Sequence, residues 1–231
     1  MFKRWDELTH RSRKWYEFRQ HYIMGPFKKI AALTPWYDQN AYAEFLQRRD
    51  ETFREWLPGS SVLELGCGPG YLSAIFSATY GTKTYVGVDY SLGMVRDARS
   101  QYFFDFVNAD AFYLPFPDKS FDVVFSAYLF HHLPPKKRSL ALQEQARVAR
   151  RALIIEETFG FEPGFWRWPY WAYYTLADGS FYRYTLKEWP EIFRSINIRL
   201  KKLFFTQERT ILHRLICMVA EPIEGGRDPV G

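Results

Sequence analysis

A short apolar run passes directly into a glycine-rich turn at residues 62–73, Val-Leu-Glu-Leu-Gly-Cys-Gly-Pro-Gly-Tyr-Leu-Ser. Val62–Leu65 has the length and composition of a buried strand. Gly66, Gly68 and Gly70 let the backbone turn sharply and approach a ligand, because they carry no Cβ. The pattern predicts a strand, a tight turn that lines a nucleotide-type pocket, and a helix that begins near Gly70. The alternative is a turn that only connects a strand to a helix.

A second strand pattern, Thr84–Val88, ends in Asp89. In dinucleotide-binding folds a carboxylate at this place accepts hydrogen bonds from the ribose hydroxyls. The alternative role for Asp89 is a helix cap, but Ser91 is better placed to cap the helix expected over Leu92–Ser100. We therefore predict that Asp89 binds a ribose. Glu64 lies just before the glycines, where it would repel a pyrophosphate, and this favours a cationic ligand.

At these residues the chain resembles the class I S-adenosylmethionine-dependent methyltransferases, over about residues 60–157. It is most similar to the group typified by quinone-biosynthesis methyltransferases, the methyltransferase domain 11-like group. The remaining motifs that carry the resemblance are Asn108–Ala111, Leu114–Phe116, Lys119–Ser126 and Tyr128–Leu133. The resemblance implies S-adenosyl-L-methionine as methyl donor and S-adenosyl-L-homocysteine as product. One departure is Arg147–Arg151, which runs almost directly into a strand where the group usually has a Lys-Pro-Gly-Gly-like turn.

The resemblance also implies which residues bind the cofactor. Asp110, with the backbone of Ala111, is expected to read the adenine, Ser126 to face the methionine end, and Glu64 to lie near the ammonium group. The full set expected to bind the cofactor is Glu64, Gly66, Cys67, Gly68, Gly70, Asp89, Tyr90, Met94, Asp110, Ala111 and Ser126.

Strand and helix patterns alternate through the middle of the chain. Strands are expected near 61–65, 84–88, 103–108, 121–127 and 151–156, and helices near 70–80, 91–100 and 136–149. This alternation predicts a parallel α/β sheet. A helix near 185–195 and two extended runs, 198–206 and 210–220, predict a C-terminal antiparallel hairpin. We therefore expect an α/β, Rossmann-like fold, in which a seven-stranded, mostly parallel sheet has an antiparallel last strand, helices on both faces and an aromatic lid insertion.

We expect residues 1–231 to form a single methyltransferase domain. Its expected parts are an N-terminal helical arm or cap (1–58), a cofactor-binding core (59–157), an aromatic lid (158–184), a C-terminal helix and strand hairpin (185–221) and a flexible tail (222–231). The start has no signal-peptide core and no apolar stretch is long enough to span a membrane, so a cytoplasmic monomer or homodimer is expected. Two cysteines without metal-ligand spacing predict no metal site and no disulfide framework.

Aromatic residues make up 19% of the chain and gather in residues 159–184. This segment follows a strand at the edge where the ligand crevice of an α/β sheet opens, so a cap there would line the acceptor pocket. An aromatic wall suits an apolar, planar or lipid-like acceptor, and it also suits an amine through cation–π attraction. The alternative is an insertion that packs on the core or on a second subunit. The residues predicted to bind substrate are Tyr22, Trp166, Trp168, Trp171, Tyr174 and Tyr182.

Basic residues are frequent in the first thirty positions, which carry Lys3, Arg4, Arg11, Arg13, Lys14, Arg19, Lys28 and Lys29. With interleaved aromatic residues, this segment could contact RNA phosphates or anionic lipid headgroups at a membrane surface. The alternative is a solvated helix that covers the pocket. The formal charge of the whole chain, +5, fits both readings.

Catalysis of methyl transfer rests mainly on positioning, because the sulfonium donor is already activated. A phenol, hydroxyl or acidic carbon would also need a base, and we predict His131, His132 and Tyr128 as candidate catalytic residues. The alternative for the histidine pair is loop capping and helix packing. Three functions remain open: transfer to a small apolar or aromatic, possibly lipid-like, acceptor; RNA methylation with the basic arm; and non-catalytic cofactor binding by a regulatory protein.

Overall fold

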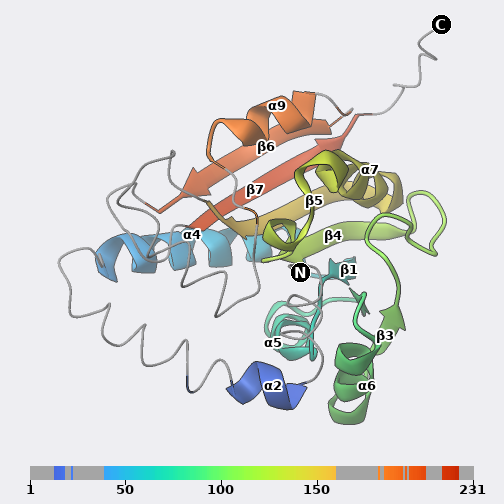
Figure 1. Cartoon of the computed structure of the whole chain (residues 1–231). Coiled ribbons are helices and arrows are strands. Elements are labelled where there is room, and N and C mark those ends of the chain that lie inside the picture. The colour runs from blue at the N-terminus through green and yellow to red at the C-terminus, as the bar shows by residue number, and fades with distance from the viewer. Residues whose placement is uncertain are drawn as a thin grey trace, which may run out of the picture.

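The structure is a computed structural model that describes residues 13–18, 22, 39–159, 182, 185–194, 196, 198–206 and 215–223. Its strands are β1 (Ser61–Leu65), β2 (Thr84–Asp89), β3 (Asp105–Asn108), β4 (Phe121–Ala127), β5 (Ala149–Thr158), β6 (Ile198–Phe205) and β7 (Leu215–Pro222). They form one seven-stranded sheet in the order β3-β2-β1-β4-β5-β7-β6 (Figure 1).

The pairing of the strands confirms the predicted fold class. The strands β1 to β5 pair in parallel, whereas β7 runs antiparallel to both β5 and β6. Strand order reverses between β1 and β4, so these two strands flank the topological switch point of the sheet. In open α/β sheets, ligands bind in the crevice at the carboxyl ends of the strands at such a point. The sheet therefore places the glycine turn after β1 and the segment after β4 beside this crevice.

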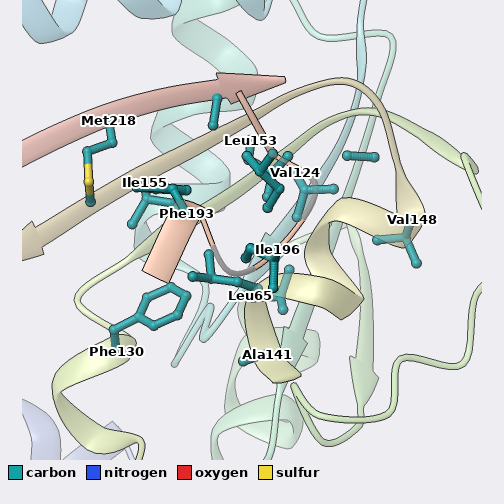
Figure 2. Close-up of a cluster of buried hydrophobic side chains, with 14 of the residues drawn as sticks. Leu65, Val124, Phe130, Ala141, Val148, Leu153, Ile155, Phe193, Ile196 and Met218 are labelled. Carbon is teal, nitrogen blue, oxygen red and sulfur yellow. The ribbon is translucent and has the colours of Figure 1, made fainter. Parts of the chain in front are cut away.

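Helices cover both faces of the sheet, as predicted. They are α2 (Arg13–Phe18), α4 (Gln39–Trp56), α5 (Tyr71–Tyr80), α6 (Leu92–Gln101), α7 (Arg138–Val148) and α9 (Glu188–Arg194), with short 3₁₀ turns η2 (Phe130–His132) and η3 (Pro135–Lys137). Buried residues of α7 and α9 pack on one face of the sheet, with Phe130, Val124 and Ile155 (Figure 2). Residues of α4 and α5 pack on the other face, with Phe125 and Ile154. We call these the α7–α9 face and the α4–α5 face.

Local sequence signals explain where α5 and α6 begin. Ser91 caps α6, because its hydroxyl oxygen accepts a hydrogen bond from the Met94 amide at 3.3 Å. The helix α5 begins at Tyr71, directly after Gly70, whose φ is 82°. A Cβ at Gly70 would lie 2.9 Å from the Phe106 ring, so both the backbone angle and the close packing require glycine here. Both predicted helix starts are confirmed.

The connection between α7 and β5 is as short as the sequence predicts, since α7 ends at Val148 and β5 begins at Ala149. The guanidinium of Arg147 donates to the backbone carbonyls of Leu114 and Phe116 at 3.0 and 2.8 Å. It also forms ion pairs with Glu144 and Asp118. These contacts hold the short connection at the amino edge of the sheet, away from the switch-point crevice.

Most of the predicted N-terminal arm lies outside the described residues, as does the predicted tail beyond Ile223. Of the predicted lid, the structure describes Thr158, Phe159 and Tyr182. Within the described ranges, no helix combines the length and apolar character needed to cross a membrane.

Candidate functional site

The glycine turn is tied to the end of β2. The amides of Gly66 and Cys67 donate to the Val88 carbonyl at 2.8 and 3.0 Å. Gly66, Gly68 and Gly70 all have positive φ, at 72°, 54° and 82°, which L side chains rarely adopt. A Cβ at Gly68 would meet no atom within 4 Å, so this part of the backbone borders open space. The turn therefore presents bare backbone at the carboxyl edge of the sheet, as a close-fitting ligand requires.

Asp89 ends β2 and faces this turn. Its carboxylate accepts hydrogen bonds from the Gly68 amide at 2.9 Å and from the Ser91 amide at 2.7 Å. The Asn108 side chain donates to the backbone carbonyls of Asp89 and Tyr90 at 3.0 and 2.9 Å, which joins the ends of β2 and β3. These two backbone amides fix the Asp89 carboxylate at the edge where the sequence predicts that it binds a ribose.

Glu64 is buried on the α4–α5 face below the turn. Its Oε2 accepts hydrogen bonds from the Ser73 hydroxyl and, at 3.0 Å, from the Tyr85 hydroxyl. Burial raises the pKa of Glu64 to about 7, although these two hydrogen bonds act in the opposite direction. A cationic group near Glu64 would favour its charged form, which agrees with the cationic ligand that the sequence predicts.

The other predicted cofactor residues divide into buried and accessible side chains. The Cys67 side chain packs with Val95, Ala98 and Phe106, its thiol donates to the Gly68 carbonyl at 3.7 Å, and burial raises the pKa of that thiol. Met94 is also buried, whereas Tyr90 is 68% exposed at the end of β2.

Asp110, Ala111 and Ser126 follow or end the neighbouring strands. Asp110 Oδ1 accepts a hydrogen bond from the Phe112 amide at 3.0 Å, which shapes the loop after β3, and Ala111 is half-buried beside it. Ser126, paired with Leu65 at the switch point, is fully buried, and its Oγ has no hydrogen-bond partner within the described part of the chain. The assignment of these residues to the adenine and methionine ends stays a prediction.

The predicted catalytic histidines lie on the α7–α9 face. His131 is 2% exposed, and its Nδ1 forms a 2.5 Å hydrogen bond with Glu157 Oε1. The His131 amide donates to the other oxygen of Glu157 at 3.2 Å, and the His132 ring lies 4.2 Å from the His131 ring. This geometry favours the packing role for His131, because its carboxylate partner is fully buried.

Tyr128 differs from the histidines in both backbone and surroundings. It follows β4 directly and has a φ of 55°, which is rare for a residue other than glycine. Its amide donates to the Glu156 carbonyl at 2.9 Å, and its hydroxyl donates to Glu156 Oε1 at 2.7 Å. Outliers of this kind cluster at functional sites, where the surrounding structure supports the strain. Sequence reasoning did not single out Glu156 or its neighbour Arg49, although a glutamate that follows a buried apolar run is a readable signal.

The predicted substrate residues are only partly described. Trp166, Trp168, Trp171 and Tyr174 lie outside the described residues. The Tyr182 amide donates to the His131 carbonyl at 3.2 Å, and the Arg138 guanidinium lies 5.7 Å from the centre of its ring. Tyr22 is exposed, and its ring lies 5.0 Å from that of Phe18. The substrate assignments stay predictions.

Two family models match parts of the chain. Residues 62–152 match the model described as methyltransferase domain, and residues 19–103 match the model of protein-L-isoaspartate(D-aspartate) O-methyltransferase. The first match extends from β1 into β5 and contains the glycine turn, Asp89 and Tyr128. These matches bear on the core of the sheet and do not identify the quinone-biosynthesis group in particular.

Curated relatives match the same core. The fatty-acid O-methyltransferase of Mycolicibacterium smegmatis is 37% identical over 95 residues, which are 40% of this chain and 34% of that protein. The phthiotriol/phenolphthiotriol dimycocerosates methyltransferase of Mycobacterium tuberculosis is 36% identical over 97 residues, 41% of this chain and 35% of that protein. The probable tRNA methyltransferase 9B of Bos taurus is 34% identical over 96 residues, 41% of this chain and 20% of that protein. The chain thus aligns with 40% or less of the length of these relatives.

Solved structures share the fold at low sequence identity. One is the complex between the Haloferax volcanii Trm112 methyltransferase activator and the putative methyltransferase, with a TM-score of 0.62, 20% identity, and coverage of 75% of this chain and 89% of the matched chain. Another is the [4+2]-cyclase SpnF, with a TM-score of 0.61, 18% identity, and coverage of 76% of this chain and 80% of that one. These likenesses support the sheet order and helix placement described above.

Proposed function

We propose that this chain transfers a methyl group from S-adenosylmethionine to a small apolar or aromatic acceptor, lipid-like in character, because residues 62–152 match the model of a methyltransferase domain. The observation that carries the proposal is the pairing of the bare glycine turn with Asp89 at the switch point of the sheet.

The residues at the edge have separate roles in this proposal. The turn backbone allows close approach, Asp89 binds the ribose hydroxyls, Asp110 and Ala111 bind the adenine, and the Ser126 region faces the methionine end. The donor supplies an activated methyl group in a cationic sulfonium. The chain's own contribution is to hold the acceptor in line with that methyl group and to exclude water, since in-line displacement depends mainly on orientation.

The acceptor class rests on two supports. The names of the relatives from Mycolicibacterium smegmatis and Mycobacterium tuberculosis refer to a fatty acid and to a dimycocerosate lipid. The aromatic residues of segment 159–184 give this chain an apolar region directly after β5. An acceptor with an apolar body agrees with both the names of these relatives and the aromatic residues of this segment.

A second candidate function, RNA methylation, is favoured by the relative named probable tRNA methyltransferase 9B and by the basic residues of the first thirty positions. Phosphate contacts would make acceptor binding fall steeply as salt rises. The sequence also leaves a third function open, non-catalytic cofactor binding, because the predicted cofactor residues explain binding and do not by themselves prove transfer. Turnover separates it from the first two.

The first test measures S-adenosylmethionine affinity by calorimetry in the wild type, Asp89→Ala and Asp105→Ala. Loss of the Asp89 carboxylate removes charge-assisted hydrogen bonds worth about 1.5–3 kcal/mol each, so affinity should fall roughly ten- to a hundredfold or more. Asp105, an exposed aspartate at the start of β3, is the matched control and should bind as the wild type does. Equal affinity in all three proteins would refute the ribose assignment.

The second test identifies the acceptor class. A radiolabelled methyl group from S-adenosylmethionine is offered with a cell extract, which is then separated into organic-soluble, nucleic-acid, protein and small polar fractions. Label in the organic fraction supports the lipid-like acceptor, whereas nuclease-sensitive label supports RNA. Cofactor binding without label in any fraction supports the non-catalytic function.

A further inference from the structure

A buried polar cluster lies beside the switch point on the α4–α5 face, at the carboxyl ends of β4 and β5. Glu156 of β5 pairs in register with Ala127, so it lies next to the end of β4. Its Oε1 accepts the Tyr128 hydroxyl at 2.7 Å and lies 3.5 Å from the Arg49 guanidinium of α4. Three elements thus converge on one carboxylate that neither the cofactor assignment nor the packing of the core uses.

Glu156 is poorly explained by packing alone. Its side chain is 2% exposed, and its second oxygen, Oε2, has no hydrogen-bond partner within the described part of the chain. Burying a carboxylate without full hydrogen bonding costs several kcal/mol in general, so such a residue calls for a role. The ionisable groups that act on Glu156 are Arg49 of α4, Tyr128 after β4 and Glu157 of β5. Tyr42 of α4 acts on Tyr128, and Glu156 itself acts on Cys217 of β7.

Burial raises the pKa of Glu156 above its ordinary range, while Arg49 and the hydrogen bond from Tyr128 act in the opposite direction. A carboxylate with a raised pKa holds a proton more readily at neutral pH than an exposed one, which suits a general base. Arg49 keeps the charged form accessible, so the group can take up a proton and later release it.

Tyr128 connects this carboxylate to the place where the acceptor is expected. The next residue, Leu129, lies against the glycine turn, since a Cβ at Gly66 would be 3.2 Å from Leu129 Cδ1. Tyr128 as a whole residue is 38% exposed, whereas its hydroxyl is buried where it donates to Glu156. The positive φ of Tyr128 and its amide bond to the Glu156 carbonyl fix the residue in this position. Its phenol therefore spans from the edge of the sheet to the buried carboxylate.

Resting on the proposed methyl transfer, we infer that Tyr128 and Glu156 form a proton relay, in which Glu156 is the final proton acceptor for hydroxyl-bearing acceptors. The acceptor oxygen forms a bond to the methyl carbon as the carbon–sulfur bond of the sulfonium breaks and its electron pair stays on sulfur. The acceptor proton passes to the Tyr128 oxygen while the phenolic proton passes to Glu156 Oε1. Tyr128 is left neutral and Glu156 protonated, and Glu156 later returns its proton to solvent.

The relay makes a prediction that depends on the acceptor. A phenol such as 4-dodecylphenol must lose a proton during transfer, whereas dodecanoate carries none at neutral pH. Glu156→Gln and Tyr128→Phe should therefore lower kcat on 4-dodecylphenol by roughly a hundredfold or more, with the KM for S-adenosylmethionine changed less than about twofold. Turnover of dodecanoate should fall much less. The double variant should be no slower than the single ones, because the two residues act as one unit.

Tyr80→Phe is the matched control, because the Tyr80 hydroxyl also donates to a carboxylate, Asp50, at 2.9 Å on the same face of the sheet. It lies at the end of α5, away from the glycine turn, and its kcat should stay within about twofold of the wild type. In the wild type the acid limb of the kcat–pH profile on the phenol reports Glu156, and Glu156→Gln should abolish that limb. A Glu156→Gln enzyme with wild-type kcat and an unchanged limb would overturn the relay.

A measurement without any acceptor separates this inference from the proposed function. Infrared difference spectra of the cofactor-free protein between acidic and neutral pH should contain a protonated-carboxyl band that disappears in Glu156→Gln. Tyr128→Phe should shift that band and Tyr80→Phe should not. If the band has the same frequency in Tyr128→Phe as in the wild type, the relay is contradicted. If the band shifts in Tyr128→Phe as expected but the wild-type protein methylates no acceptor in the extract, the proposed function is contradicted instead.

Discussion

Two adjacent glutamates of β5, Glu156 and Glu157, point to opposite faces of the sheet and have opposite surroundings. Glu157 is fully buried and is hydrogen-bonded to the His131 ring, to the His131 amide, and to both the amide and the hydroxyl of Thr158. Among the described residues, the Glu156 side chain is hydrogen-bonded to Tyr128 and Arg49, and Tyr128 follows β4 at the edge where the glycine turn lies. One carboxylate is enclosed by the fold, and the other is connected to the site.

This difference follows from the alternation of side chains along a strand, because one residue step moves a side chain to the other face. Buried charged or polar pairs can be structural or chemical with the same residue types. Here the two glutamates differ in where their hydrogen-bond partner lies relative to the switch point of the sheet. The His131 ring is hydrogen-bonded to the buried Glu157, whereas Tyr128 directly precedes Leu129, whose side chain packs against Gly66 of the turn.

The largest expected effect comes from breaking the enclosed pair. His131→Ala leaves the buried Glu157 carboxylate without its ring partner and should lower the free energy of unfolding by about 3–5 kcal/mol. Chemical denaturation with circular dichroism measures the loss, and kcat of the remaining folded protein should stay within a few-fold of the wild type. A stable His131→Ala protein that lacks turnover would restore the histidine as a catalytic residue and remove the contrast between the two faces.

A smaller effect is expected from Glu64, which shares the α4–α5 face with Glu156. Its pKa rises from 4.5 to about 7 on folding, so the folded state binds the proton more tightly than the unfolded state. This stabilisation is complete below pH 4.5 and is lost as pH rises through about 7, which amounts to about 3 kcal/mol. Glu64→Gln should lack this dependence. Parallel stability curves for the two proteins between pH 4 and 8 would contradict it.

Glu144 provides the opposite sign as a control. Its hydrogen bond from Arg147 lowers its pKa, so its contribution to stability is present above its unfolded pKa and is lost as pH falls. Glu144→Gln and Glu64→Gln should therefore change the pH dependence of unfolding in opposite directions.

The sequence predicted the sheet well because its signals are local. The run Val62–Leu65, the glycines after it and the cap at Ser91 each fix a neighbouring element, and the structure places β1, α5 and α6 within about one residue of expectation. Strand order and the antiparallel β7 follow from the family resemblance together with chain alternation. β3, which was expected to begin near 103, begins at Asp105 after a fully exposed Phe103.

The site was less predictable, because the cluster of Arg49, Tyr128 and Glu156 depends on contacts between residues that are distant in the sequence. Arg49 and Glu156 are 107 positions apart, and no local pattern joins them. The positive φ of Tyr128 could not be predicted from the sequence, because a tyrosine does not indicate such a backbone angle. His131 and His132 attracted a catalytic prediction because histidine titrates near neutral pH, but only the structure shows that the His131 ring faces a buried carboxylate.

The smallest expected effect on stability comes from replacing Arg49, which lies beside Glu156. The Arg49 side chain is a quarter exposed and lies 3.5 Å from Glu156, so Arg49→Gln should cost only about 1 kcal/mol of stability. Its charge helps to keep Glu156 ionised, and its removal should raise the pKa of Glu156 further. The acid limb of the kcat–pH profile on 4-dodecylphenol should therefore move to higher pH, with turnover recovered in alkaline buffer.

Arg48→Gln is the matched control for this shift, because the Arg48 guanidinium lies over the Phe204 ring at 4.8 Å instead of beside Glu156. It should leave the acid limb in place. If both variants moved the limb equally, the general positive charge of α4 would account for the effect, and the specific contact between Arg49 and Glu156 would not. If only Arg49→Gln moves the acid limb, the contact between Arg49 and Glu156 sets the pH at which this carboxylate of the α4–α5 face titrates.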